Sequence, residues 1–426
     1  MRDMVTLKEE LKQGKHDEVL KKLYVDDHVL DYQRERYIGA LDEFEKIFGT
    51  SEVEIYSASG RCEVGGNHTD HQHGMVIATA INQDAIAVVN KSDDGKIHVF
   101  SRGYDEVEID INDLEPHYAE ESDTDAFVRG VAGALSRRGC KVGGFNAYVS
   151  NDVLVGAGLS SSACFEIILG SVINGLFNDG KIDPVVIAQA GQEAENDYVG
   201  KPCGLMDQMA SSVGGLVHLD LEDPTAPKVE KLDFDMEKHN YSLCIVDTKA
   251  SHSDGADDYA SIPEEMKKVA KFFGKKYLRE VDENEFFPQI SGLRAVLGER
   301  CILRAYHFFE EERRVMEEVE ALKEGNMEVF LKLVKESGDS SFKYLQNVYN
   351  SNHVQKQTMG IALAASEKIL GSHGVCRIHG GGFAGTIEVF VENSFVDEYK
   401  RRMDKLFGRN ACHILKIRQE GGIKVF

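Results

Sequence analysis

"VLVGAGLSSSACFEIILGSVINGLF", Val153 to Phe177, is the run of this sequence that says most about its fold. Gly156 and Gly158 permit a backbone that Cβ atoms would obstruct, and three serines then open a helix whose body is almost wholly apolar. The first turn of such a helix presents free N–H groups and the positive end of its dipole, which is a phosphate site. A serine hydroxyl there can also reach a Mg²⁺ ion held by the phosphates.

The same run has a plainer interpretation. A serine N-cap on a core helix with a flexible entry uses the same glycines and serines. The run is not the Walker sequence, because no Gly-Lys-Ser/Thr follows, and it is not Gly-x-Gly-x-x-Gly either. Taken alone, it leaves phosphate binding and simple capping open.

Helices and strands are predicted on both sides of this run. Residues 1–50 are charged, with apolar residues at helical intervals, which predicts two or three surface helices. Short β-branched runs between residues 53 and 110 are typical of strands, and strands return near the end in "CRIHGGGFAGTIEVFVE" and "HILKIR". Residues 301–347 predict two amphipathic helices broken at Gly325-Asn326. The class is therefore α/β or α+β.

Length and charge limit the possible partners. A chain of 426 residues with 42% hydrophobic and 28% charged residues predicts two domains, with a boundary near the proline-containing residues 222–231. The net charge of −23 disfavours nucleic acid and anionic membranes as partners. Eight scattered cysteines without a Cys-x-x-Cys pair indicate a reducing compartment. With a charged N-terminus and no apolar run near ~20 residues, we expect a cytoplasmic protein.

A second run, "GQEAENDYVGKPCGLMDQ", contains acids suited to phosphoryl transfer. Such a transfer needs one carboxylate near the attacking hydroxyl and another group to hold Mg²⁺. Asp207 can supply the first and Glu195 the second. The alternative is that Asp207 only caps the next helix, and taken alone this simpler role is favoured.

Two further runs are rich in glycine. "RIHGGGFAGTIEVF" places Gly380, Gly381, Gly382 and Gly385 between strand-like pieces, as a hairpin turn or as backbone that closes against a ligand. "GRCEVGGNHTDHQHG", residues 60–74, holds three histidines and an aspartate that suggest a metal site, a sugar-binding turn or a polar loop. Residues spaced i, i+3 and i+5 on a strand-to-turn segment do not converge easily on one ion, so a metal-dependent hydrolase is disfavoured.

Three of these runs, in this order, resemble the three motifs of the GHMP small-molecule kinases, and "GRCEVGGNHTDH" resembles the galactokinase branch. "PCGLMDQ" and "SHSDGADDYASIPEEM", with His252, Ser253 and Tyr259, are similar to that branch too. The resemblance implies an N-terminal ribosomal-protein-S5-like domain over residues 51–225 with an unusual left-handed crossover. It also implies a C-terminal ferredoxin-like domain over 226–426, with the active site between the two. Residues 1–50 form a helical extension without an assigned role.

The resemblance also implies roles for single residues. Asp207 would face the C1 hydroxyl of a sugar, with Arg61 beside it and beside the transferring phosphoryl group. Ser162 and Glu195 would hold Mg²⁺. The sugar hydroxyls would contact Asn67, His68, Asp70 and Tyr259. The ATP phosphates would lie against Gly156, Ala157, Gly158, Leu159, Ser160, Ser161 and Ser162, and Gly380, Gly381 and Gly382 would form the back of the cleft.

Five positions depart from the galactokinase pattern. Asn67 stands where the family has Glu, and Glu63 stands where it has Asn. This inversion suggests a coupled exchange that preserves one local hydrogen-bond pair. His71 replaces Tyr, Leu154 replaces Pro, and "VYNSNHVQKQ" has lost a Cys-Pro-Glu-Leu-Asp pattern.

The leading hypothesis is an ATP-dependent galactokinase that makes galactose 1-phosphate, a monomer or weak homo-oligomer whose partners are a small-molecule sugar and ATP. A galacturonate 1-kinase is the first alternative, because Asn67 removes a carboxylate that would repel a C6 carboxylate. A catalytically silent sugar-sensing regulator is a remote alternative, since Ser161, Ser162 and Asp207 are all retained.

Overall fold

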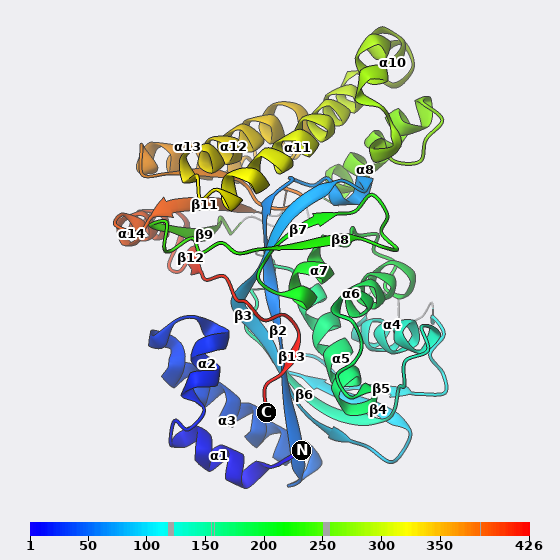
Figure 1. Ribbon diagram of the computed structural model, residues 1–426, viewed down its shortest axis with the longest axis vertical. Helices are drawn as coiled ribbons and strands as arrows, with labels where there is room; N and C mark the ends of the chain where they lie inside the picture. Colours follow the sequence, from blue (N-terminus) through cyan, green and yellow to red (C-terminus); the bar gives the residue numbers. More distant parts are fainter. Residues whose placement is uncertain (118–122, 155, 157, 250–255, 384) are drawn as a thin grey trace.

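A large mixed sheet forms the centre of the protein (Figure 1). The computed structural model describes residues 1–117, 123–154, 156, 158–249, 256–383 and 385–426, and within them this sheet has nine strands. The order is β1-β2-β3-β6-β4-β5, with β13 and β7 added beside β2 and β3, and β8 beside β7. The strands are β1 (Arg2–Asp3), β2 (Glu52–Gly65), β3 (Met75–Lys91), β4 (Lys96–Ser101), β5 (Val107–Asp110), β6 (Phe145–Asn151), β7 (Leu216–Asp220), β8 (Lys228–Leu232) and β13 (Ile423–Lys424).

Strand β2 carries the first part of the site. It is buried from Val53 to Gly65 without alternation, because other elements cover both of its faces. Its antiparallel register with β3 shifts between Ser59 and Arg61, a β-bulge that changes the direction in which the Arg61 side chain points. Gly60 lies at this bulge, where a Cβ atom would come within 3.0 Å of the Leu159 carbonyl oxygen. The bulge therefore brings β2 against the glycine-serine loop.

Helices α4 to α7 cover one face of the sheet (Figure 1). Their bounds are α4 (Thr124–Arg137), α5 (Ser161–Asn178), α6 (Pro184–Glu193) and α7 (Met206–Val213). Helix α5 buries most of its length in the main core, as its apolar sequence predicted. Its N-terminus lies where β2 has its bulge.

The first 50 residues fold against the opposite face, at the end of the sheet where the N-terminus lies (Figure 1). The predicted helices are present as α1 (Met4–Lys12), α2 (Asp17–Tyr24) and α3 (Leu30–Phe48). They share one apolar cluster with Val53, Ile86 and Phe426. Arg36 of α3 is buried and pairs with fully buried Asp84 at 2.6 Å. The extension is thus an integral part of the folded chain.

A smaller antiparallel sheet forms the second half, with order β10-β11-β9-β12 in the described part of the chain. Its strands are β9 (Tyr241–Asp247), β10 (Gly374–Ile378), β11 (Thr386–Glu392) and β12 (Cys412–Leu415). The helices of this half are α8 (Ala256–Phe272), α9 (Glu283–Phe286), α10 (Ile290–Leu297), α11 (Glu299–Lys323), α12 (Met327–Ser340), α13 (Thr358–Leu370) and α14 (Val396–Phe407). The predicted break at Gly325-Asn326 is confirmed, because Asn326 caps α12.

Two segments extend the first sheet beyond the predicted boundary at residue 225. Strand β8 pairs with β7 from Lys228 to Leu232. The chain also returns at its end, where β13 pairs with β2 and Phe426 joins the N-terminal apolar cluster. The strand predicted in "HILKIR" stops at Leu415 for this reason, because the chain then crosses back to the first sheet.

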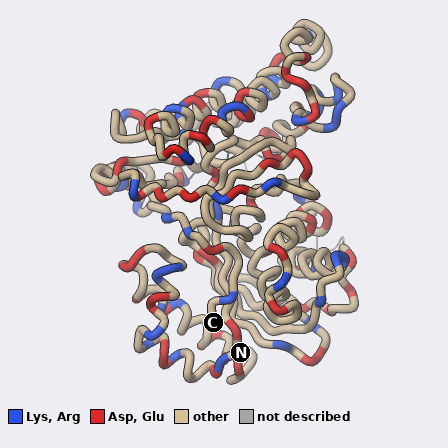
Figure 2. The backbone as a smooth tube through the Cα atoms, in the orientation of Figure 1, with Lys and Arg blue, Asp and Glu red and all other residues tan. Residues whose placement is uncertain are grey.

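Acidic and basic residues are interspersed along the backbone of the outer helices and turns (Figure 2). The acidic excess is therefore distributed over the chain rather than confined to one segment.

Candidate active site

Arg61 and Asp207 form the centre of the site. Arg61 donates from Nε to Asp207 Oδ1 at 2.6 Å and from Nη2 to Oδ2 at 2.5 Å, the paired geometry that holds a carboxylate most firmly. Its Nη1 donates to the Gly158 carbonyl oxygen. Burial would raise the pKa of Asp207, but the Arg61 guanidinium outweighs burial and holds that pKa below its usual value. Asp207 is therefore ionised at neutral pH.

The glycine-serine loop joins this pair to the start of α5. Gly156 and Gly158 both have positive φ, at 80° and 68°, as predicted for a backbone that excludes Cβ atoms. Ser160 precedes the helix, yet its side chain makes no capping hydrogen bond and donates instead to Asp207 Oδ2 at 2.7 Å. The simple N-cap interpretation therefore does not describe Ser160. Ala157 lies outside the described residues.

Asp207 lies in the first turn of α7. The N-cap residue of this helix is Leu205, which makes no side-chain capping hydrogen bond. Its carboxylate points to Arg61 and Ser160 rather than to the N–H groups of its own helix. The capping role considered for Asp207 is thus not the arrangement that the structure contains.

Ser162 and Glu195 also lie close together. Glu195 sits in the π-helical turn η4 (Ala194–Tyr198) and is buried, with Oε1 3.5 Å from the Ser162 hydroxyl. Gln208 donates to Glu195 Oε2 at 3.0 Å, and Lys201 Nζ lies 2.9 Å from Oε1. A hydroxyl and a carboxylate oxygen at the phosphate loop are hard oxygen donors of the kind that Mg²⁺ takes.

The other predicted residues meet at one end of this centre. His68 has a φ of 58°, and its ring centroid lies 5.1 Å from that of Tyr259. Gly381 fits between these two rings, since a Cβ atom there would come within 2.3 Å of Tyr259 and 2.9 Å of His68. The structure therefore brings His68, Tyr259 and the second glycine run together. His252 and Ser253 lie outside the described residues.

The pKa values of His68 and Asp70, at this end of the site, are both shifted far from their ordinary values. Burial, and then the charges of His307 and Arg304, lowers the pKa of His68 to about 3, so its imidazole is neutral. Its Nε2 has no hydrogen-bond partner among the described residues. Burial, and then the carboxylates of Asp207 and Glu63, raises the pKa of Asp70 to about 7. A neutral imidazole and a carboxyl group can both exchange hydrogen bonds with sugar hydroxyls.

Asn67 is placed differently from its predicted neighbours. Its amide donates to Glu63 Oε1 at 2.8 Å and to the Gly380 carbonyl oxygen at 2.6 Å. Its Oδ1 accepts from Ser341 at 2.5 Å and from Asn347 at 3.2 Å. The side chain is fully buried, and its donors and acceptor are satisfied within the protein. These protein partners account for the hydrogen bonds of the Asn67 side chain, and its contact with a sugar stays a prediction.

Glu63 belongs to a buried network that sequence reasoning missed. Arg377 donates to Glu63 Oε1 at 3.0 Å, and its Nε lies 2.9 Å from Glu388 Oε2. All three side chains are at most 1% exposed. Arg377 opens the second glycine run, three residues before Gly380, but no spacing rule connects it with Glu63. His379, which accepts from the Glu63 N–H at 3.3 Å, was missed too, as were Lys201 and Gln208, which contact Glu195.

The histidines of residues 68–73, for which a metal site was considered and disfavoured, have other neighbours in the structure. No group of three or more His, Cys, Asp or Glu residues in the described ranges is placed to hold a metal ion. His73 instead stacks on Tyr277 with ring centroids 3.7 Å apart, and His71 packs against His68. His71 and His73 therefore pack against neighbouring rings.

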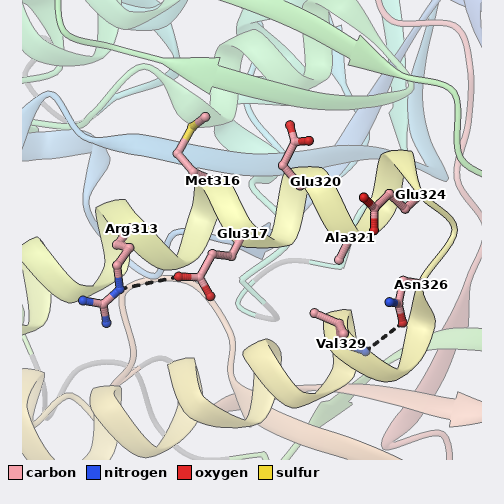
Figure 3. A pocket seen from close by; sticks show the side chains of 8 residues that line it. All are labelled: Arg313, Met316, Glu317, Glu320, Ala321, Glu324, Asn326 and Val329. Carbon is pink, nitrogen blue, oxygen red and sulfur yellow. Dashed lines mark hydrogen bonds and ion pairs between the residues drawn. The ribbon is translucent and has the colours of Figure 1, made fainter.

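A surface groove lies elsewhere, between α11 and α12 (Figure 3). Within it, Arg313 pairs with Glu317 at 3.5 Å, and Asn326 accepts from the Val329 N–H at 3.2 Å. The groove is lined by Arg313, Met316, Glu317, Glu320, Ala321, Glu324, Asn326 and Val329. None of the residues predicted for the site is among them.

Comparisons with known proteins agree on one family. The family models "Galactokinase galactose-binding signature" and "GHMP kinases N terminal domain" match residues 42–91 and 126–215. A galactokinase of Clostridium tetani is 30% identical over 373 residues, 86% of this chain and 91% of the relative. A galactokinase of Glaesserella parasuis is 31% identical over 362 residues, 84% of this chain and 90% of the relative.

Solved structures share the fold. The crystal structure of Lactococcus lactis galactokinase complexed with galactose has a TM-score of 0.78 at 22% identity, covering 91% of this chain and 100% of that chain. Methanococcus jannaschii mevalonate kinase has a TM-score of 0.59 at 17% identity, covering 86% and 99%. The predicted mixed fold is thereby confirmed. Among the described helices, none combines the length and apolar character needed to cross a bilayer.

Proposed function

The chain belongs to the galactokinase branch of the GHMP kinases, and on that premise we propose that it transfers the γ-phosphoryl group of ATP to the C1 hydroxyl of galactose. The products are galactose 1-phosphate and ADP. The observation that carries this proposal is the Arg61–Asp207 pair, which is hydrogen-bonded to the glycine-serine loop on both sides. It puts a carboxylate, a fixed cation and a phosphate-binding backbone in one place.

The low pKa of Asp207 defines its part in the reaction. A strongly ionised carboxylate is a weak base, so it orients the sugar hydroxyl and accepts the proton late in the transfer. Phosphoryl transfer has a loose transition state and depends mainly on positioning and charge neutralisation. Arg61 supplies the neutralising charge beside the transferring group, and the backbone N–H groups before α5 hold the other phosphates.

Mg²⁺ fits the pair formed by Ser162 and Glu195. Their oxygens are hard donors that lie 3.5 Å apart at the phosphate loop. When bound, the ion neutralises phosphate charge and orients the terminal phosphoryl group. Gln208 holds the other Glu195 oxygen and so keeps Oε1 turned toward Ser162.

The sugar end consists of His68, Asp70 and Tyr259, with Asn67 behind them. Galacturonate finds no support as the substrate, because the relatives found are galactokinases. The charges at this end also disfavour a C6 carboxylate. The Arg377 guanidinium, which could attract it, is already paired with Glu63 and Glu388.

A panel of hexoses and uronic acids, assayed for ADP release, tests the proposal. Galactose should be turned over with the phosphate attached at C1, as read by ³¹P and ¹H NMR of the product. Asp207→Ala should lose at least ~10³-fold in kcat. Asp197→Ala, an acid-to-alanine change at an exposed position of the same segment, is the matched control and should keep wild-type activity. Turnover of galacturonate but not galactose, or full activity in Asp207→Ala, would overturn the proposal.

Three properties stay predictions. They are a monomeric or weakly oligomeric state, a cytoplasmic location, and the exclusion of nucleic acid and membranes as partners, which follows from the net charge of −23.

A further inference from the structure

Lys201 forms an ion pair with the carboxylate oxygen at which the metal ion is expected. Its Nζ lies 2.9 Å from Glu195 Oε1, the same oxygen that the Ser162 hydroxyl approaches at 3.5 Å. The other oxygen of Glu195 is held by the buried amide of Gln208. A metal ion that binds Glu195 Oε1 must therefore take the place of the lysine ammonium group.

The backbone of Lys201 is fixed, whereas its side chain can move. Its N–H donates to the Glu195 carbonyl oxygen at 2.9 Å, and Pro202 restricts the next φ angle. The side chain, in contrast, is 66% exposed, although its partner Glu195 is only 4% exposed. A flexible four-carbon stem with a point charge at its end can change partners without any backbone movement.

The charges around Lys201 indicate what its second partner is. Glu195 and Asp207 lie near it, and Gln208 links Glu195 to buried Glu166. Arg61 is already committed to Asp207 by two hydrogen bonds. ATP bound at the loop that carries Ser162 would bring phosphate oxygens there. An ammonium displaced from Glu195 then finds a new anion within the same site.

We propose that Lys201 is a further catalytic residue, an ammonium that rests on Glu195 in the free enzyme and moves to a non-bridging oxygen of the terminal ATP phosphate when Mg²⁺ takes Glu195. This inference rests on the proposed function. Lys201 competes with the metal before substrate binds and adds positive charge to the transferring phosphoryl group afterwards. No covalent bond forms or breaks at the lysine. The plainer possibility is a surface ion pair of little consequence.

Lys201→Met removes the charge and keeps most of the side-chain length. If Lys201 both competes with the metal ion and assists the transfer, this variant should bind the metal ion more tightly and react more slowly. Mn²⁺ binding to the enzyme without sugar, measured by electron paramagnetic resonance, should become tighter by about threefold or more, because the competing ammonium is gone. In contrast, kcat with galactose should fall by about 10- to 100-fold, because the transferring group loses a cation. Lys201→Arg should recover most of kcat, since it restores the charge.

Lys181→Met is the matched control, because Lys181 forms an exposed ion pair with Asp179 and lies outside the site. It should leave both measurements unchanged. Unchanged or weaker Mn²⁺ binding in Lys201→Met, or an unchanged kcat, overturns the inference, and unfolding curves verify that each variant is folded. If the wild-type enzyme phosphorylates no sugar, the proposed function fails. The Mn²⁺ titrations then still decide whether Lys201 competes for Glu195.

Discussion

Asn67 donates a hydrogen bond to Glu63 across 2.8 Å, and both side chains are completely buried. These two residues carry the acid and the amide in the order opposite to the galactokinase pattern. The bond explains how the inversion is tolerated, because an amide and a carboxylate can pair whichever position holds which group. The coupled exchange expected from the sequence thus has a direct physical basis. Sugar choice then depends on the residues in front of this pair.

Asn67→Glu alone should damage the enzyme. It places two carboxylates within hydrogen-bond distance of each other in a buried site, which costs about 3–5 kcal/mol of stability. Urea unfolding should show that loss, and kcat/KM for galactose should fall by at least ~10²-fold. The double variant Glu63→Asn/Asn67→Glu should recover much of both values. A double variant no better than the single one would sink the coupled-exchange explanation.

Arg61→Gln should change both the rate and its pH dependence. Losing the guanidinium should lower kcat by about 10²- to 10³-fold. Burial then raises the pKa of Asp207 against only the Ser160 hydrogen bond and the Lys201 charge, so the acid limb of the kcat/KM profile should move to higher pH. Arg138→Gln, which breaks a partly exposed ion pair with Glu193, is the control. An acid limb that stays in place would show that Asp207 does not control it.

Asp70→Asn should stabilise the ligand-free protein at high pH. Because the folded-state pKa of Asp70 is about 7 and its ordinary value is 3.8, the folded chain binds an extra proton between these values. Ionised Asp70 therefore destabilises the fold above pH 7, and this penalty disappears as the pH falls toward 4. The variant should gain about 4 kcal/mol at pH 8 and less than half of that at pH 5, measured by urea unfolding. Asp197→Asn, at an exposed site, should show no such difference.

Gly158→Ala should weaken ATP binding. The residue has a φ of 68°, and a Cβ atom would lie 3.0 Å from both His379 Nδ1 and Thr386 Oγ1. The loop must then shift, so KM for ATP should rise by about tenfold or more. Gly95→Ala separates the two causes, since Gly95 has a φ of 77° with open space around it. That control should lose only about 1 kcal/mol of stability and keep its KM. Equal KM values in the two variants would contradict the prediction.

Much of the candidate site was predictable because its residues lie in short runs. The positive φ of Gly156 and Gly158 follows from glycine itself, and α5 follows from its apolar sequence. The hydrogen-bond partner of the Ser160 side chain was not predictable, because a serine before a helix ordinarily caps that helix. Only the approach of Asp207 from α7 turns that hydroxyl away from its own helix. The contribution of β8 and β13 to the first sheet was missed, since pairing between distant strands has no local signal.

The sequence by itself determined the phosphate loop, the helix behind it and the kinase family, because backbone freedom and helix burial are properties of consecutive residues. The tertiary structure alone decided the partners of Asn67. Its side chain meets Gly380 and Ser341, which are 313 and 274 positions away in the sequence. A buried amide must satisfy its hydrogen bonds with whatever groups the fold brings near it. The role of such a residue is therefore set by packing and not by its own sequence neighbours.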